Sequence, residues 1–216
     1  MNPDHENLCR SPEWASYLQR DILPAVTAGI GLGKDMLEMG PGPGAATAWL
    51  SEHVVTLTAL EADPAAAARL AARHPGGNLT VDTGDATAMP YPDESFDSVG
   101  SFTMLHHVPT AAAQYRILAE ALRVLRPAGT LLGSDSLAST GLHHFHADDT
   151  YNPVEPTTLL VWLRALGFGA VTITVDNVLM FTARKAAPGT DDEADCTQPR
   201  DDKEEEEEEE EEVIPS

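Results

Sequence analysis

The segment Leu37-Glu38-Met39-Gly40-Pro41-Gly42-Pro43-Gly44 constrains the fold more than any other part of the 216-residue chain. An apolar run ends in a carboxylate, and three glycines then follow at alternate positions. Glycine lets the backbone turn sharply and approach a ligand closely because it has no Cβ, while proline stiffens such a turn. The segment therefore predicts a buried strand, a tight turn and a helix N-terminus, the arrangement with which doubly wound sheets bind nucleotide-type cofactors.

Acidic residues follow the next two apolar runs. Residues 54–60 are expected to form a strand that ends at Glu61, 21 residues after Gly40. A carboxylate at this point can accept hydrogen bonds from both hydroxyls of a ribose. Residues 79–83 form the next expected strand, and Asp85 follows it, placed to accept a hydrogen bond from an adenine amino group. The pattern predicts an adenosine-containing cofactor.

The glycine loop on its own is compatible with other interpretations. Gly40, Gly42 and Ala45 fit the G-x-G-x-x-G/A spacing of dinucleotide-binding folds, and a tight turn without a ligand fits as well. A short-chain nicotinamide oxidoreductase needs a Tyr-x-x-x-Lys pair to move a proton. None of the four tyrosines has a lysine four residues later, which argues against an NAD-type oxidoreductase.

Five motifs occur in a fixed order along residues 11–185. They are the glycine segment, Leu60–Pro64, Gly84–Ala86 with Pro90 and Ser95–Asp97, Leu105–Val108, and Arg123–Gly129. Their order and spacing resemble those of the class I S-adenosylmethionine-dependent methyltransferase family, in particular the small-molecule branch that contains quinone and sterol methyltransferases. The resemblance implies an α/β, Rossmann-like fold: a doubly wound, mostly parallel seven-stranded sheet with an antiparallel last strand.

The resemblance also implies a function and a cofactor site. It places the glycines against the methionine part of S-adenosylmethionine, Glu61 against the ribose, and Asp85 with Ala86 against the adenine. The expected cofactor-binding residues are Glu38, Gly40, Gly42, Gly44, Glu61, Ala62, Asp85, Ala86 and Phe102. The expected activity is methyl transfer to a small organic acceptor, and a catalytically silent methyltransferase-like binding module is the alternative. The chain departs from the family pattern at Glu38, where aspartate is commoner, and at Ala128, where glycine is usual.

Two groups of histidines could face the acceptor. His106 and His107 follow the fourth expected strand, and they either anchor the loop or take part in the reaction, with one ring inward and the other toward the pocket. His143, His144 and His146 follow the fifth strand, close to two aspartates. Histidine and aspartate can bind a metal ion, but this spacing matches no familiar metal signature, so no metal is expected. We expect His106 or His146 to act as a general base, since the histidine pKa lies near working pH.

Charge divides the chain into two parts. The net charge is −22, and the residues from 186 onward contribute 15 acids but only 2 bases, including nine consecutive glutamates. Such a segment lacks the apolar side chains that a core requires. We therefore expect one methyltransferase domain over residues 1–185 and a disordered acidic tail over residues 186–216. The tail is either a solubilising appendage or a docking segment for a basic partner.

Several helices and strands can be predicted from their end signals. Ser11 followed by Pro12 starts a helix, which is expected both to cap the edge of the sheet and to cover the cofactor. A second helix is expected over residues 111–125, with Pro127 as its stop, and a third from Pro156 to Gly167. Residues 171–175 alternate in polarity, residues 178–183 follow after Asp176-Asn177, and the two segments predict a closing hairpin.

Composition disfavours several other classes of protein. The chain offers no basic stripe for nucleic acid and no run of about 18 apolar residues for a membrane span. Its two cysteines form no disulfide framework, and the first residues carry charges rather than a secretory signal. A cytoplasmic protein with a small-molecule substrate is therefore expected, with its oligomeric state left open.

Overall fold

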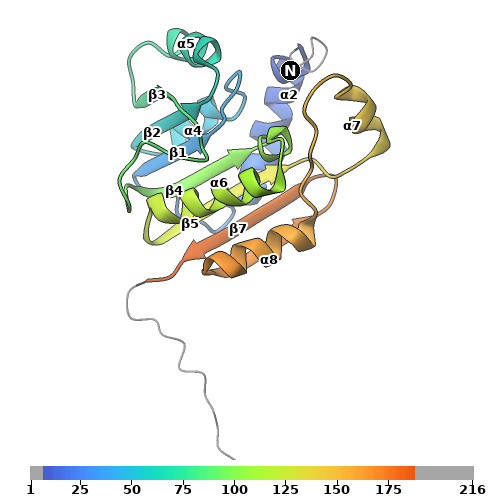
Figure 1. The fold of residues 1–216 in the computed structure, drawn as a ribbon. Coiled ribbons are helices and arrows are strands. Elements are labelled where there is room, and N and C mark those ends of the chain that lie inside the picture. The colour runs from blue at the N-terminus through green and yellow to red at the C-terminus, as the bar shows by residue number, and fades with distance from the viewer. Residues whose placement is uncertain (1–6, 188–216) are drawn as a thin grey trace, which may run out of the picture.

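Seven strands form one sheet in the computed structural model, which describes residues 7–187 (Figure 1). The strands are β1 (Asp35–Met39), β2 (Thr56–Glu61), β3 (Leu79–Thr83), β4 (Phe96–Phe102), β5 (Leu125–Asp135), β6 (Phe168–Val175) and β7 (Leu179–Lys185). Their order is β3-β2-β1-β4-β5-β7-β6. The first five strands pair in parallel, whereas β7 runs antiparallel to both β5 and β6. The predicted doubly wound sheet with an antiparallel last strand is confirmed.

Helices cover both faces of this sheet. They are α2 (Pro12–Tyr17), α3 (Leu23–Thr27), α4 (Thr47–His53), α5 (Pro64–Arg73), α6 (Ala111–Val124), α7 (Thr140–Phe145) and α8 (Pro156–Leu166), with a π-turn η1 (Leu18–Ile22) and a 3-10 turn η2 (Leu105–His107). Neighbouring residues of a strand point to opposite faces, and Leu37 of β1 accordingly packs with α6 and α8, while Met36 packs with α3 and α4. Figure 1 shows α6 and α8 on the face toward the viewer.

The helix ends follow the signals in the sequence. The Ser11 side chain accepts a hydrogen bond from the N–H of Trp14 at 3.1 Å, and α8 ends at Gly167, whose φ of 98° suits glycine. One boundary differs from the prediction. The helix predicted to run to residue 125 already ends at Val124, because Leu125 pairs with Phe96 of β4 and begins β5.

Two of the recognised motifs meet at the amino ends of the strands. The carboxylate of Asp97 accepts hydrogen bonds from the N–H groups of Lys34 and Asp35 at 2.7 and 3.0 Å. The guanidinium of Arg126 lies 2.8 Å from both Asp35 and Asp97. These motifs therefore join β1, β4 and β5 at the edge of the sheet that lies opposite the glycine loop.

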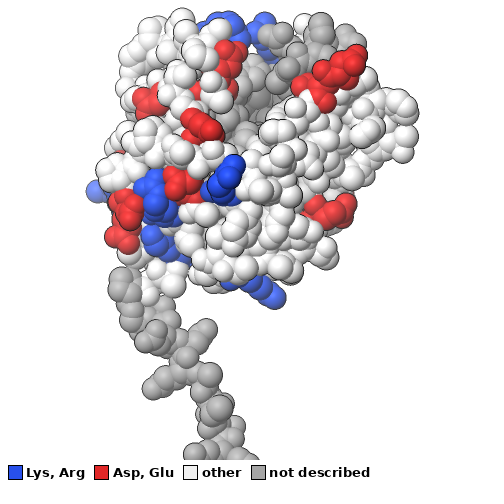
Figure 2. All heavy atoms as spheres, in the orientation of Figure 1, with Lys and Arg blue, Asp and Glu red and all other residues white. Residues whose placement is uncertain are grey.

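Acidic and basic side chains are mixed on the face that α6 and α8 cover (Figure 2). On α6, for example, Arg123 forms ion pairs with Glu120 and Asp93. This face offers no continuous basic stripe of the kind that nucleic acid requires. None of the helices within residues 7–187 is long and apolar enough to cross a bilayer.

The predicted acidic tail lies outside the described residues from position 188 onward. We expect a chain that ends at Lys185 to keep its melting temperature and its cofactor affinity, since all seven strands and both core clusters lie before that point. Thermal melts and calorimetric titration of the shortened and full-length chains provide the comparison. A melting temperature several degrees lower in the shortened chain would show that the tail packs on the domain.

Candidate functional site

A cavity of about 1220 Å³ opens at the carboxyl ends of the strands. Its floor lies where the chain connections of β1 and β4 run in opposite directions, which is the switch point at which doubly wound sheets bind ligands. The glycine loop after β1, the ends of β2 and β4, the turn after β3 and the N-terminal helix all contribute to its lining. Eight of the nine residues predicted to bind a cofactor line this one cavity; they are Glu38, Gly40, Gly42, Glu61, Ala62, Asp85, Ala86 and Phe102.

The glycine loop needs its glycines for two different reasons. Gly40 has a φ of 60°, and a Cβ there would lie 2.3 Å from the Met104 side chain. Gly42 has a φ of 52°, and a Cβ there would meet no atom within 4 Å, so the loop is open at this position. Gly44 is not part of the lining of the cavity. It faces α5 instead, since a Cβ at this position would lie 2.5 Å from the Leu70 side chain. Gly44 therefore shapes the loop where it passes α5.

Glu61 organises the backbone around the cavity. One carboxylate oxygen accepts a hydrogen bond from the N–H of Gly42 at 3.0 Å, and the other accepts one from the N–H of Asp63 at 3.0 Å. These bonds tie the end of β2 to the glycine loop of β1. Each carboxylate oxygen has more than one acceptor site, so both retain capacity to bind a ligand hydroxyl.

Glu38 is the buried acid of the site. Only 2 % of its surface is exposed, and it accepts a hydrogen bond from the Thr47 hydroxyl at 2.7 Å. Burial raises the pKa of Glu38 to about 7, the Thr47 hydrogen bond opposes the shift, and the nearby Glu61 carboxylate adds to it. The Glu38 side chain is thus divided between its acid and carboxylate forms near neutral pH.

Asp85 lies at the exposed rim. The N–H of Thr87 donates to its carboxylate at 2.8 Å, and this bond, together with one from the Thr87 side chain, holds the pKa of Asp85 below its usual range. Asp85 is therefore a carboxylate at neutral pH, and a carboxylate can only accept hydrogen bonds.

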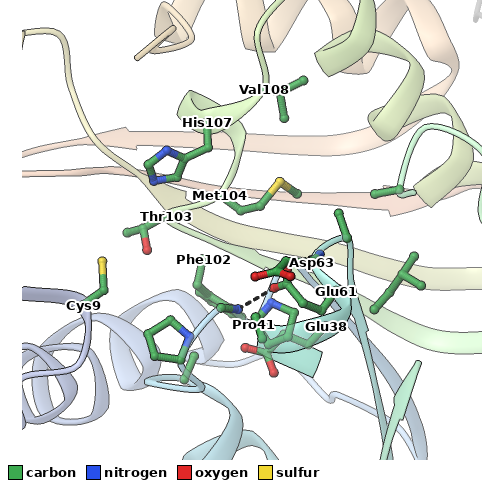
Figure 3. Close-up of a pocket in the computed structure, with 18 of the residues that line it drawn as sticks. Cys9, Glu38, Pro41, Glu61, Asp63, Phe102, Thr103, Met104, His107 and Val108 are labelled. Carbon is green, nitrogen blue, oxygen red and sulfur yellow. Dashed lines mark hydrogen bonds between the residues drawn. The ribbon is translucent and has the colours of Figure 1, made fainter. Parts of the chain in front are cut away.

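Figure 3 shows the acids and the histidine at opposite ends of the cavity. Glu38 and Glu61 lie at one end, His107 lies at the other, and Thr103 and Met104 come between them. Thr103 has a φ of 53°, a backbone conformation that is uncommon for a threonine and occurs more often at functional sites. Neither Thr103 nor Met104 was predicted, since nothing in the residue types signals their position.

The two predicted histidines are buried behind the cavity wall. His106 is 3 % exposed, and its Nδ1 is hydrogen-bonded to the carboxylate of Asp135 at the end of β5. His146 is 4 % exposed, and its Nδ1 is hydrogen-bonded to the carbonyl oxygen of Leu142 at 2.7 Å. His107, the last residue of η2, is the histidine that belongs to the lining. The neighbouring pair thus divides into one inward ring and one ring toward the pocket, but the ring toward the pocket is that of His107 and not that of His106, the residue predicted to act on the acceptor.

The three rings nevertheless form one cluster. The ring centroids of His106 lie 4.1 Å from His107 and 5.3 Å from His146, and Tyr151 stacks on His146 at 4.3 Å. Sequence reasoning missed Asp135 and Tyr151. Asp135 could have been found by the rule that selected Glu61, because it is an acid at the carboxyl end of a strand.

The N-terminal helix closes one side of the cavity. Cys9, Arg10, Trp14 and Leu18 all contribute to the lining. The segment that follows packs on the sheet through Leu23 and Val26 of α3. The two expected roles of this segment, capping the sheet and covering the cofactor, are therefore compatible in one structure.

Known proteins share both the sequence pattern and the fold. The family model described as "Methyltransferase domain" matches residues 37–133. The chain is 35 % identical over 124 residues to the phthiotriol/phenolphthiotriol dimycocerosates methyltransferase 1 of Mycobacterium ulcerans, with 56 % of this chain and 45 % of that protein covered. A probable S-adenosylmethionine-dependent methyltransferase of Mycolicibacterium smegmatis is 31 % identical over 135 residues, covering 59 % of this chain and 50 % of that protein. The chain spans about half the length of these curated relatives.

Solved structures match over more of the chain. The Haemonchus contortus phosphoethanolamine N-methyltransferase 2, determined with phosphomonomethylethanolamine and S-adenosylhomocysteine, has a TM-score of 0.69 at 13 % identity, with 86 % of this chain and 58 % of that one covered. A putative Haloferax volcanii methyltransferase in complex with the activator Trm112 has a TM-score of 0.66 at 16 % identity, with 85 % and 92 % covered. Identities this low establish the shared fold alone.

Proposed function

Since this chain belongs to the class I S-adenosylmethionine-dependent methyltransferase family, we propose that it transfers a methyl group from S-adenosylmethionine to a small organic acceptor. The observation that carries this proposal is the single cavity that collects the glycine loop, two strand-end acids and a histidine. A short-chain nicotinamide oxidoreductase would need the Tyr-x-x-x-Lys pair that the sequence lacks.

The cavity residues suit this cofactor. When bound, S-adenosylmethionine supplies a methyl group on a positively charged sulfonium, so the leaving group carries its own activation. Gly40 and Gly42 let the loop approach the ligand, Glu61 has acceptor capacity for ribose hydroxyls, and Glu38 offers negative charge near the loop. A cationic ligand and a buried acid of raised pKa stabilise one another, because the ligand favours the charged form of the acid.

The protein's main contribution would be to position and desolvate the reactants. Orientation of two reactants can contribute about 7–11 kcal/mol to catalysis. Trp14, Phe102 and Met104 line the cavity, and their apolar side chains would help to exclude water from the bound reactants.

A hydroxyl acceptor would have to lose its proton during the reaction. The names of two relatives point to oxygen acceptors: one is the triol methyltransferase above, and the other is the 27-O-demethylrifamycin SV methyltransferase of Amycolatopsis mediterranei, 41 % identical over 59 residues. Of the histidine cluster, His107 lies at the end of the cavity away from Glu38 and Glu61 (Figure 3), and the rings of His106 and His146 contact it from behind. A histidine ring nitrogen is a group that can accept such a proton. We assign the acceptor to that end, with His106 and His146 as candidate catalytic residues and His107 at the cavity surface.

Glu38 makes cofactor binding dependent on pH. The bound cation should lower the pKa of Glu38 from about 7, so that binding at pH 7 releases part of a proton. Affinity for S-adenosylmethionine should therefore rise about tenfold between pH 6 and pH 8, because the free protein no longer has to give up this proton at the higher pH. Calorimetric titration in buffers of different ionisation enthalpy measures the protons released.

The matched control for this prediction is Glu38→Gln. Glutamine has nearly the same shape and still accepts the hydrogen bond from Thr47, but it does not titrate. The cofactor itself carries an amino group, so the informative quantity is the difference between the two pH profiles. Identical profiles in the wild type and the variant would exclude Glu38 as the linked group.

A metabolite screen tests the function itself. Purified protein, S-adenosylmethionine with a labelled methyl group and fractionated small-molecule extracts should yield a labelled product, and oxygen acceptors are the first class to try. Cofactor binding without transfer to any fraction would favour the silent binding module.

A further inference from the structure

Three histidines from two distant segments meet at the acceptor end of the cavity. His106 and His107 belong to η2, and His146 directly follows α7. One ring nitrogen from each residue lies within 4.8 Å of one ring nitrogen from each of the others. His106 and His146 are buried, while His107 is partly exposed and lines the cavity.

Hydrogen bonds fix the rings of the two buried histidines. The carbonyl oxygen of Leu142 can only accept, so the Nδ1 of His146 must carry the hydrogen of that bond. The carboxylate of Asp135 likewise accepts from the Nδ1 of His106, and it also accepts from the backbone N–H of Ser136 at 2.7 Å. In a neutral imidazole the other nitrogen then holds the lone pair. Both buried rings therefore have their lone pair on Nε2.

Asp135 and Tyr151 hold the cluster in place. A histidine that binds a metal ion typically donates its other ring N–H to a carboxylate or a backbone carbonyl, which orients the ring and makes it more basic. Asp135 has this relation to His106, and the Leu142 carbonyl has it to His146. Tyr151 stacks on His146, and its hydroxyl donates to the carbonyl oxygen of Leu137 at 3.2 Å.

We propose that His106, His107 and His146 bind a divalent transition-metal ion such as Zn²⁺. Imidazole nitrogens suit Zn²⁺ and its neighbours rather than Mg²⁺ or Ca²⁺, which prefer oxygen ligands. A Zn–N distance of about 2.0–2.1 Å separates tetrahedral ligands by about 3.4 Å, so the rings would approach one another by at most about 1.4 Å on binding. Three protein ligands leave a fourth position for water or a substrate atom. Because His107 lines the cavity, that position faces the acceptor end.

Metal binding can be measured without the methyl-transfer reaction. The full chain, stripped of metal with a chelator and desalted, is titrated with Zn²⁺ by calorimetry and with Co²⁺ by visible absorption. We expect one Zn²⁺ ion to bind per chain with a Kd in the micromolar range or below, and Co²⁺ to give the intense absorption of a four-coordinate site. The titration contains neither cofactor nor acceptor, so its result does not depend on the proposed function.

Two substitutions distinguish Zn²⁺ binding at the histidine cluster from nonspecific Zn²⁺ binding elsewhere on the chain. His107→Ala removes one ligand but keeps the poly-glutamate segment, whose carboxylates could bind cations weakly, and it should weaken Zn²⁺ binding about a hundredfold or more. His144→Ala removes an exposed histidine of α7 whose Nδ1 is hydrogen-bonded to the Thr140 carbonyl, and it should leave Zn²⁺ binding unchanged. Mg²⁺ serves as the ion that the site should not bind.

Asp135→Asn tests the orientation of His106. The substitution should weaken Zn²⁺ binding about ten- to a hundredfold, since partners of this kind typically have effects of that size. Thermal melts identify variants that fail to fold, and His107→Gln replaces His107→Ala if the alanine variant does. Absence of stoichiometric binding by the wild type, or equal binding by the His107 variant and the wild type, would overturn the proposal.

Discussion

Turnover should fall at least about a hundredfold when His106 or His146 is replaced by alanine, while the Kd for S-adenosylhomocysteine changes by no more than a few-fold. Both rings contact His107, with ring centroids 4.1 and 5.6 Å away, and His107 lies at the end of the cavity away from the acids that we assign to the cofactor (Figure 3). Single-turnover kinetics at saturating cofactor measure the chemical step, and calorimetry measures the cofactor affinity.

Thermal melts are needed beside the kinetics, because His106→Ala leaves the buried carboxylate of Asp135 without its ring partner. His107→Ala is the milder third variant, since this ring is only partly buried. A parallel fall in stability, affinity and rate would mean that the rings only anchor their loops. Normal turnover in all three variants would leave catalysis to positioning alone.

Chelation distinguishes two ways in which the cluster could act. If metal-free enzyme loses turnover and regains it with Zn²⁺, the ion accounts for the loss in the histidine variants. If metal-free enzyme turns over normally while the histidine variants do not, a ring nitrogen that acts as the base accounts for the loss instead. A ring nitrogen whose lone pair binds the metal ion cannot accept a proton at the same time, so the two results exclude one another.

Replacing Glu61 by alanine should weaken the binding of S-adenosylhomocysteine about ten- to a hundredfold without unfolding the protein. Hydrogen bonds to a charged acceptor contribute about 1.5–3 kcal/mol, which corresponds to this range of affinity. The structure gives a second cause for this loss of affinity beside the expected ribose contact. The Glu61 carboxylate accepts a hydrogen bond from the N–H of Gly42 at 3.0 Å, and the substitution removes this hydrogen bond from the glycine loop. Calorimetric titration measures the loss.

Two further variants complete this experiment. Glu61→Gln removes the charge but keeps one acceptor oxygen, and it should bind with intermediate affinity. Glu52→Ala removes an exposed acid of α4 that does not line the cavity, and it should bind like the wild type. Unchanged affinity in Glu61→Ala would mean that the partner of the ribose lies elsewhere.

The fold could be predicted because its signals are local. The glycine segment, the strand-end acids and helix signals such as Ser11 and Gly167 each depend on a few consecutive residues, and the sheet follows from their order. The strand boundary at Leu125 could not be predicted, because it depends on pairing with Phe96 in another strand.

The cavity end near Glu61 was predictable for the same reason, whereas the histidine cluster was not. His106 and His146 lie 40 residues apart in the sequence and meet through ring contacts with each other and with Tyr151, and no spacing in the sequence encodes those contacts. Metal signatures are short patterns along one element, so a set of histidines assembled from separate loops escapes them.

The direction of β7 has a practical consequence. Leu179 pairs with Asp135 at the cavity edge of the sheet, and the strand then runs to Lys185 at the opposite edge, where the Lys185 amine donates to the carbonyl oxygen of Leu125. A group that is attached to the chain after β7 is therefore joined to the molecule on the side away from the mouth of the cavity. An affinity tag, a surface tether or a fused reporter placed after Lys185 should leave the entrance clear, whereas the same addition before α2 would start next to Trp14 and the entrance itself.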